Sequence, residues 1–188
     1  AGRLLAPRLA EKYRSDNCAV LALNDGGVVV GAQIAAQLHC VLGLLVLSEI
    51  ALPRETNAVG AIAMDGTFSY DSSLSSGEVH EMQSEYRGYL EEQKLTKLHE
   101  MNRLLVGGGA IPSELLQDSH VILVADGLRG QSLLAAAEAY LKPIKHSRLV
   151  VATPMADMPA LDKIHVMADE IHCLNVVDDT FAIDHYFE

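Results

Sequence analysis

The chain has 188 residues, which corresponds to about one globular domain with enough apolar surface to build a core. Hydrophobic residues make up 49% of the chain and charged residues 21%, so the composition excludes a disordered chain and a coiled coil. The formal net charge of −11 repels polyanions and excludes nucleic acid as an expected partner.

The apolar runs and the cysteines indicate the cellular compartment that is expected for this protein. The longest apolar runs, such as Val41–Leu47, are far shorter than the roughly 20 residues that span a bilayer, so no membrane segment is expected. The first residues lack the features of a secretory leader. Cys18, Cys40 and Cys173 form no paired metal or redox motif. We therefore expect reduced thiols and a cytoplasmic protein.

The first quarter of the chain predicts a helix followed by a strand, helix, strand unit. Apolar residues at helical spacing predict a leading helix over Leu4–Tyr13. The continuous apolar run Cys18–Leu23 is too short for a helix and is typical of a strand buried on both faces. Helical spacing returns over Val28–Leu38, and Val41–Leu47 is again expected to form a buried strand.

The middle of the chain predicts a small hairpin and a long helix, an insertion at about residues 58–106. An Asp65-Gly66 pair lies between the β-prone runs Ala58–Ala63 and Thr67–Tyr70, which is a strong hairpin signal. A long amphipathic helix is then expected over Glu78–Val106. This helix offers a face through which two copies of the chain could form a homodimer, and the sequence leaves the oligomeric state open.

The remaining elements alternate between strands and helices. They are expected at His120–Val124, Ser132–Leu141, Leu149–Ala152, Pro159–Ala168 and Glu170–Asn175. Such alternation predicts one α/β domain over residues 1–188, with a doubly wound, mostly parallel sheet. Ligands of these sheets bind at the carboxyl ends of strands near the topological switch point. Three turns are therefore candidate sites: Asn24–Gly27, Ser48–Arg54 and Ala125–Ser132.

The best candidate site is the turn that follows the buried strand at Val121. Backbone N–H groups at a helix start attract anions, and glycine lets a ligand approach the backbone, so a phosphorylated small molecule is the expected ligand. Asp126 is suited to accept hydrogen bonds from sugar hydroxyls or to help hold a divalent cation. The alternative is an ordinary turn at Asp126-Gly127, with Ser132 acting only as a helix cap.

Residues Val121–Ser132 resemble the signature of the type I phosphoribosyltransferases: four apolar residues, two acids, a glycine, and a short loop that opens a helix. The four apolar residues, Asp126 and Gly127 match this signature. Leu21–Gly27 is similar to the family's first strand and pyrophosphate loop, of which the two glycines remain. Three further stretches also look like a subgroup of uncharacterised bacterial members: Ala58–Tyr70, the long helix after it, and the closing stretch Asp178–Phe187. The resemblance therefore covers nearly the whole chain.

The resemblance implies a parallel sheet with a hood. It also implies transfer of ribose 5-phosphate from magnesium-bound phosphoribosyl pyrophosphate to a nitrogenous base, by positioning and leaving-group stabilisation. It places Asp126 at the ribose as the catalytic residue and as the candidate Mg²⁺ ligand. The implied pyrophosphate loop is Asn24, Asp25, Gly26 and Gly27. The implied phosphate-binding residues are Gly127, Leu128, Arg129, Gly130, Gln131 and Ser132.

The chain departs from the family where the family carries charge. Ala125 replaces the first signature acid, Asn24-Asp25 replaces the arginine of the pyrophosphate loop, and Ser48-Glu49 replaces a basic pair of the subgroup. Unit charges at 4 Å interact by roughly 4 kcal/mol at an effective dielectric near 20, so these changes predict weakened binding of the donor. Arg129 and Arg54 offset part of this loss. The alternative is a catalytically inactive member that binds a ligand or a protein.

Overall fold

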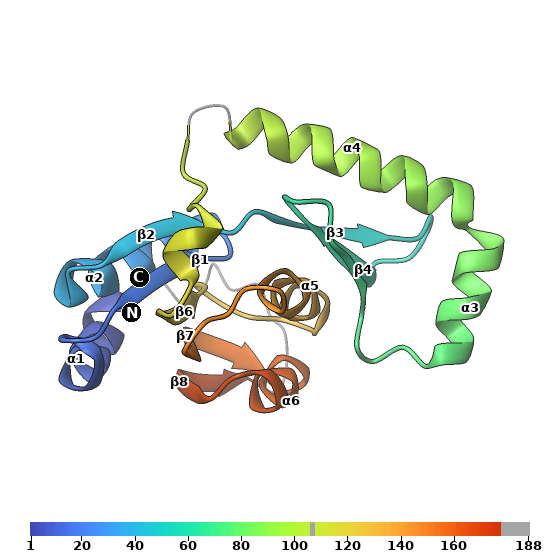
Figure 1. Ribbon diagram of the computed structural model, residues 1–188. Helices are drawn as coiled ribbons and strands as arrows, with labels where there is room; N and C mark the ends of the chain where they lie inside the picture. The colour runs from blue at the N-terminus through green and yellow to red at the C-terminus, as the bar shows by residue number, and fades with distance from the viewer. Residues whose placement is uncertain (106–107, 178–188) are drawn as a thin grey trace. The chain divides into compact units, whose positions relative to one another are not determined.

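A computed structural model describes residues 1–105 and 108–177 (Figure 1). These residues form two compact units, which are described separately. The sheet unit contains Ala1–Leu44, Ile111–Gly130 and the chain from Lys145 onward, and the hairpin unit contains Leu45–Ala110 and Gln131–Ile144. The single domain expected over residues 1–188 stays a prediction.

The sheet unit contains five parallel strands in the order β2-β1-β6-β7-β8, which confirms the expected α/β fold. From β1 the chain adds β2 on one side and later β6, β7 and β8 on the other, so the switch point lies between β1 and β6. The strands are β1 Cys18–Ala22, β2 Val41–Leu44, β6 His120–Val124, β7 Arg148–Asp157 and β8 Glu170–Val177. The helices are α1 Gly2–Tyr13, α2 Asp25–Leu38, the 3₁₀ helix η1 Ser113–Leu116 and α6 Met158–Met167.

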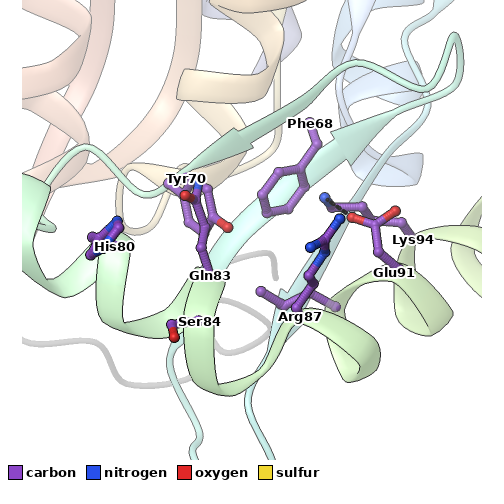
Figure 2. A pocket seen from close by; sticks show the side chains of 9 residues that line it. Phe68, Tyr70, His80, Gln83, Ser84, Arg87, Glu91 and Lys94 are labelled. Carbon is purple, nitrogen blue, oxygen red and sulfur yellow. Dashed lines mark hydrogen bonds and ion pairs between the residues drawn. The ribbon is translucent and has the colours of Figure 1, made fainter.

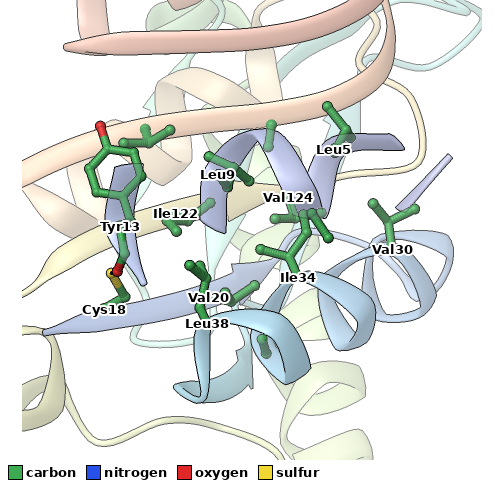
Figure 3. Packing of buried hydrophobic residues seen from close by; sticks show 14 residues of the cluster. Leu5, Leu9, Tyr13, Cys18, Val20, Val30, Ile34, Leu38, Ile122 and Val124 are labelled. Carbon is green, nitrogen blue, oxygen red and sulfur yellow. The ribbon is translucent and has the colours of Figure 1, made fainter. Parts of the chain in front are cut away.

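Helices α1 and α2 lie side by side and bury one face of this sheet (Figure 3). Leu5 and Leu9 of α1 and Ile34 of α2 are fully buried against it. Their partners are alternate residues of the central strands, such as Val20 and Ile122, because side chains with a period of two share one face. All five residues of β1 are buried, as expected for a central parallel strand.

Several boundaries in this unit differ from expectation; β7, for example, extends to Asp157 rather than Ala152. Val41–Leu47 does not form one buried strand, since β2 ends at Leu44 and Leu47 begins a strand of the second sheet. Strand β2 lies at one edge of the sheet, and Val41 is 43% exposed. Helix α2 begins at Asp25 rather than Val28 because the Asn24 side chain caps it.

The hairpin unit contains an antiparallel sheet in the order β3-β4-β5, with helices α3, α4 and α5. Its elements are β3 Leu47–Ala51, β4 Ala58–Ala63, β5 Phe68–Tyr70, α3 Ser76–Glu85, α4 Arg87–Leu105 and α5 Ser132–Leu141. The expected hairpin is confirmed, since β4 and β5 pair across the Asp65-Gly66 turn. Gly66 has a φ of 90°, a conformation that glycine adopts without strain.

The single long helix expected over Glu78–Val106 is wrong within the described residues. The helix is interrupted at Tyr86, where φ is −109° and ψ is 16°, so two helices form in its place. Helix α3 buries no residue and α4 buries only Leu90 and Met101, so neither has a broad apolar face. No helix within residues 1–105 and 108–177 has the length and apolarity that crossing a bilayer requires. The homodimer stays a prediction.

A cluster of ionisable side chains converges on Glu170, the first residue of β8. Its carboxylate accepts hydrogen bonds from Tyr13 Oη at 2.6 Å and from the Lys12 ammonium, and it lies 2.8 Å from His172 Nε2. Arg148 Nη1 lies 3.7 Å away. Burial alone raises the pKa of Glu170, but the hydrogen bonds from Lys12, Tyr13 and His172 outweigh it and lower this pKa to about 2.

This lowered pKa predicts a specific loss of stability in acid. A carboxyl group with a depressed folded-state pKa stabilises the fold above its unfolded pKa, here about 4.3, and loses that contribution as the pH falls toward 2. Glu170→Gln is expected to cost about 2 kcal/mol of unfolding free energy at pH 7 and almost nothing at pH 2. Urea denaturation at several pH values measures the difference, with exposed Glu92→Gln as control. An equal cost of Glu170→Gln at pH 7 and pH 2 would contradict this assignment.

Candidate functional site

The switch point of the sheet brings two of the three predicted turns together. Strands β1 and β6 are parallel neighbours with Ala22 opposite Val124, so both end at the same edge. Leu23 N donates to Val124 O at 2.9 Å and extends this pairing. The turn that begins at Asn24 and the turn that contains Asp126 therefore lie against each other. The third predicted turn, Ser48–Arg54, belongs to the hairpin unit.

Asn24 both caps α2 and holds Asp126. Its Oδ1 accepts a hydrogen bond from Gly27 N at 2.7 Å and one from Asp126 N at 3.4 Å. Its Nδ2 donates to Asp126 Oδ1 at 2.7 Å. One carboxylate oxygen of this half-buried aspartate is thus fixed by the protein. In sequence, an asparagine directly before a helix start is a capping signal, but its contact with Asp126 has no local signature.

Gly26 and Gly27 are required by the close approach of the two turns. A Cβ atom on Gly26 would lie 1.9 Å from Asp126 Oδ2 and 2.7 Å from Asp126 Cβ. A Cβ atom on Gly27 would lie 2.7 Å from Val124 O and 2.8 Å from Asn24 Oδ1. Both glycines belong to the first turn of α2 rather than to a loop, and their N–H groups stand at the positive end of the helix.

The segment after Asp126 is tied to strand β7. Leu128 N donates to Met155 O at 3.0 Å, and Asp157 N donates to Leu128 O at 3.1 Å. Gly130, with a φ of 63°, donates its N–H to both Asp157 carboxylate oxygens, at 3.2 Å and 3.0 Å. Two of the N–H groups predicted to bind a phosphate are therefore occupied within the chain, while Arg129 between them is exposed.

Asp157 is a residue of this site that the sequence analysis missed. Its side chain is 8% exposed, and its Oδ1 also caps α6 by accepting from Ala160 N at 2.8 Å. A buried carboxylate is retained only where hydrogen bonds satisfy it, and three N–H···O contacts do so here. An aspartate followed within two residues by Pro159 at a helix start is the available signal for the cap.

The last two predicted phosphate-binding residues, Gln131 and Ser132, belong to the hairpin unit. Gln131 O accepts from Ala135 N at 2.8 Å, which closes the first turn of α5. Ser132 is 2% exposed, and its hydroxyl donates a hydrogen bond to the Glu49 carboxylate of β3. The hydroxyl predicted to bind a phosphate is thus bonded to an anionic side chain of its own unit.

The geometry of the sheet unit is suited to binding hydroxyl groups. Asp126 supplies a carboxylate beside the glycine N–H groups of α2, and carboxylates and helix N-termini bind sugar hydroxyls and anions, respectively. Within residues 1–105 and 108–177, no group of three or more His, Cys, Asp or Glu side chains is placed to hold a metal ion.

Comparison with known proteins identifies relatives along nearly the whole chain. No family model matches it. It is 28% identical over 185 residues to a Mycobacterium tuberculosis protein named "Putative phosphoribosyl transferase", which covers 97% of this chain and 40% of that protein. The chain therefore spans well under half the length of its curated relative.

Solved structures share the fold. The crystal structure of TT1426 from Thermus thermophilus has a TM-score of 0.73 at 25% identity and covers 98% of this chain and 86% of that one. A Staphylococcus aureus hypoxanthine phosphoribosyltransferase has a TM-score of 0.54 at 13% identity, with 96% and 72% covered. A Trypanosoma brucei adenine phosphoribosyl transferase, solved with AMP, pyrophosphate and ribose-5-phosphate, has a TM-score of 0.50 at 11% identity, with 93% and 63% covered.

Proposed function

Because this chain is similar in sequence and fold to the type I phosphoribosyltransferases, we propose that it binds a phosphoribosyl compound and transfers the phosphoribosyl group to a nitrogenous base. The observation that carries the proposal is the position of Asp126, at the switch point of the sheet, fixed by Asn24 and packed against Gly26. The name of the Mycobacterium relative supports it, although the chain matches only 40% of that protein.

Asp126 is the residue proposed to orient the ribose. Its Oδ1 already accepts a hydrogen bond from Asn24, so the lone pairs that remain on the carboxylate are the ones offered to ribose hydroxyls. The N–H groups of Asp25 and Gly26 at the start of α2 are proposed to face the pyrophosphate, because the helix N-terminus attracts anions and Gly27 N is already bonded to Asn24 Oδ1. Catalysis would rest on positioning and on stabilising the leaving group.

Magnesium is proposed to reach this site on the ligand. Mg²⁺ typically takes one or two protein carboxylates together with substrate phosphates, and Asp126 fits that modest requirement. The ion would offset the charge of the pyrophosphate. Asp126 would hold the ribose in place for the incoming base.

The charges of the chain predict weak binding of an anionic donor. Asp25 lies in the first turn of α2, and its carboxylate repels phosphates. Arg129 is the cation of the segment Gly127–Gly130 and offsets part of this repulsion. The retained acid and glycines favour a transferase over a binding module without catalysis, and we expect affinities for the donor in the micromolar to millimolar range.

Isothermal titration with phosphoribosyl pyrophosphate and magnesium tests the proposal, alongside ribose 5-phosphate and nucleoside monophosphates. Asp126→Ala is expected to weaken binding at least tenfold, about 1.4 kcal/mol, because the carboxylate bonds to the ribose are lost. Asp162→Ala, which removes an exposed carboxylate of α6, serves as the matched control and should bind like the native chain.

Each outcome of this titration decides something. Donor binding that depends on Asp126 supports the proposal and justifies a screen of nitrogenous bases for turnover. Binding that is unchanged in Asp126→Ala places the ligand elsewhere and contradicts the assigned site. An absence of donor binding at millimolar concentration, in a protein shown to be folded by circular dichroism, rejects the transferase proposal.

A further inference from the structure

The hairpin unit contains a pocket of about 550 Å³ between strand β5 and helices α3 and α4 (Figure 2). This volume lies within the range typical of small-molecule sites, about 300–1,000 Å³. Phe68 and Tyr70 of β5 form one wall. The facing helical residues are His80, Gln83, Ser84, Arg87, Leu90, Glu91 and Lys94. None of them belongs to the site at β1 and β6, which lies in the other unit.

The helical wall is one polar stripe that continues through the break at Tyr86. Residues 80, 83, 84, 87, 91 and 94 recur at spacings of three and four, which place them on one face of a helix. Leu90 N donates to Tyr86 O at 2.9 Å, so the helical bonding resumes directly after the break. The stripe is polar where an ordinary core-facing helix is apolar.

Positive charge collects in this pocket although the whole chain carries −11. The Lys94 ammonium lies 4.4 Å from the Phe68 ring centroid and 2.8 Å from Glu91 Oε1, so it is held in place. Arg87 makes no salt bridge within the described part of the chain, although its charge, like that of Lys94, favours the ionised Glu91 carboxylate, and Figure 2 shows Arg87 extending from the helix toward Phe68. With Glu91 the only acid in the lining, the two cations leave a net positive charge.

The strand wall supplies an aromatic surface. Phe68 and Tyr70 share one face of β5, and their ring centroids are 4.9 Å apart at an interplanar angle of 84°. Both rings are only partly buried, so apolar area remains for a ligand. Lys94 covers Phe68 and Leu90 is only 2% exposed, which leaves the Tyr70 ring as the surface for a planar group.

We propose that this pocket binds an aromatic anion of the nucleoside monophosphate type, with the anionic group on Arg87 and Lys94 and the planar ring against Tyr70. The guanidinium fork of Arg87 suits the two oxygens of a phosphate or carboxylate. The proposal does not depend on the function assigned to Asp126, since the two sites share no residue.

NMR titration of the Asp126→Ala protein with AMP tests this inference without interference from the other site. AMP is expected to shift the ring signals of Phe68 and Tyr70. Arg87→Gln is expected to weaken that binding at least tenfold, and Tyr70→Leu several-fold. Lys97→Gln is the matched control, because Lys97 lies on α4 outside the pocket and pairs with Glu100 at 3.1 Å. Its affinity for AMP should equal that of the Asp126→Ala parent.

Adenosine and inorganic phosphate separate the two parts of the ligand. Each is expected to bind at least tenfold more weakly than AMP. Adenosine can contact only the Tyr70 ring, and phosphate can contact only Arg87 and Lys94. Phosphate that binds as tightly as AMP would overturn the aromatic part of the proposal. The whole proposal would be overturned if the Phe68 and Tyr70 signals did not shift at millimolar AMP in tenfold molar excess over the protein. An affinity for AMP that is unchanged in Arg87→Gln would also overturn it.

Discussion

Gly26→Ala is expected to destabilise the chain by about 2–3 kcal/mol, the cost of forcing an extra methyl group into a closely packed site. The new Cβ would lie 1.9 Å from Asp126 Oδ2 and 2.7 Å from Asp126 Cβ. The second distance involves an atom next to the backbone, so turning the carboxylate does not relieve the clash. The same substitution is expected to displace Asp126 and to weaken phosphoribosyl binding at least as much as Asp126→Ala. Chemical denaturation and titration calorimetry measure both effects.

A double-mutant cycle isolates this contact. In an Asp126→Gly background the clashing atoms are absent, so Gly26→Ala should then cost nothing or stabilise α2 slightly, as alanine does in helices. Gly88→Ala in α4 is the matched control, because no atom lies within 4 Å of its added Cβ. A loss of stability by Gly26→Ala that is equal in both backgrounds would contradict a role for the Gly26–Asp126 contact.

Asp157→Ala is expected to cost about 2–4 kcal/mol, the largest effect on stability among these variants. The change removes the α6 cap and leaves Gly130 N and Ala160 N without their acceptor. It also releases the segment that Leu128 and Gly130 tie to β7, so phosphoribosyl affinity should fall although Asp126 is intact. Asp157→Asn keeps one carbonyl oxygen as an acceptor, so it should lose only about half of the unfolding free energy that Asp157→Ala loses.

Ser75→Ala provides the comparison for this variant. Ser75 caps α3 in an exposed capping box with Glu78, so its loss should cost about 1 kcal/mol and leave binding unchanged. If Asp157→Ala costs no more than Ser75→Ala, then Asp157 acts as a cap alone. In that case the Gly130 contact contributes nothing to holding the loop.

The strand and helix pattern was predictable where short apolar runs are buried on both faces. β6 has the expected bounds His120–Val124, and α5 has the expected bounds Ser132–Leu141. Val41–Leu47 was wrong because uninterrupted apolarity cannot show that the chain leaves one sheet after Leu44 and enters another at Leu47. The break at Tyr86 was missed because helical spacing continues on both sides of it.

The site was predictable only in part. The rule that ligands bind at the carboxyl ends of parallel strands indicated Asn24 and Asp126. In the structure Asn24 Nδ2 lies 2.7 Å from Asp126 Oδ1. The contacts of Gly130 with Asp157 and of Ser132 with Glu49 join residues 27 and 83 positions apart, and no local pattern encodes them. The similar stretch Asp178–Phe187 lies outside the described residues, and magnesium and the cytoplasmic location stay predictions.

The central claim is that a phosphoribosyl compound binds between the ends of β1 and β6. The most direct test is a ¹H–¹⁵N spectrum of the native chain, titrated with phosphoribosyl pyrophosphate and magnesium, in which glycine amides are resolved by their nitrogen shifts. The amide signals of Gly26, Gly27 and Gly127 are expected to move together, while that of Gly66, in the β4–β5 turn, stays fixed. Fixed signals for the first three glycines at saturating ligand would contradict the claim, and so would shifts confined to the hairpin unit.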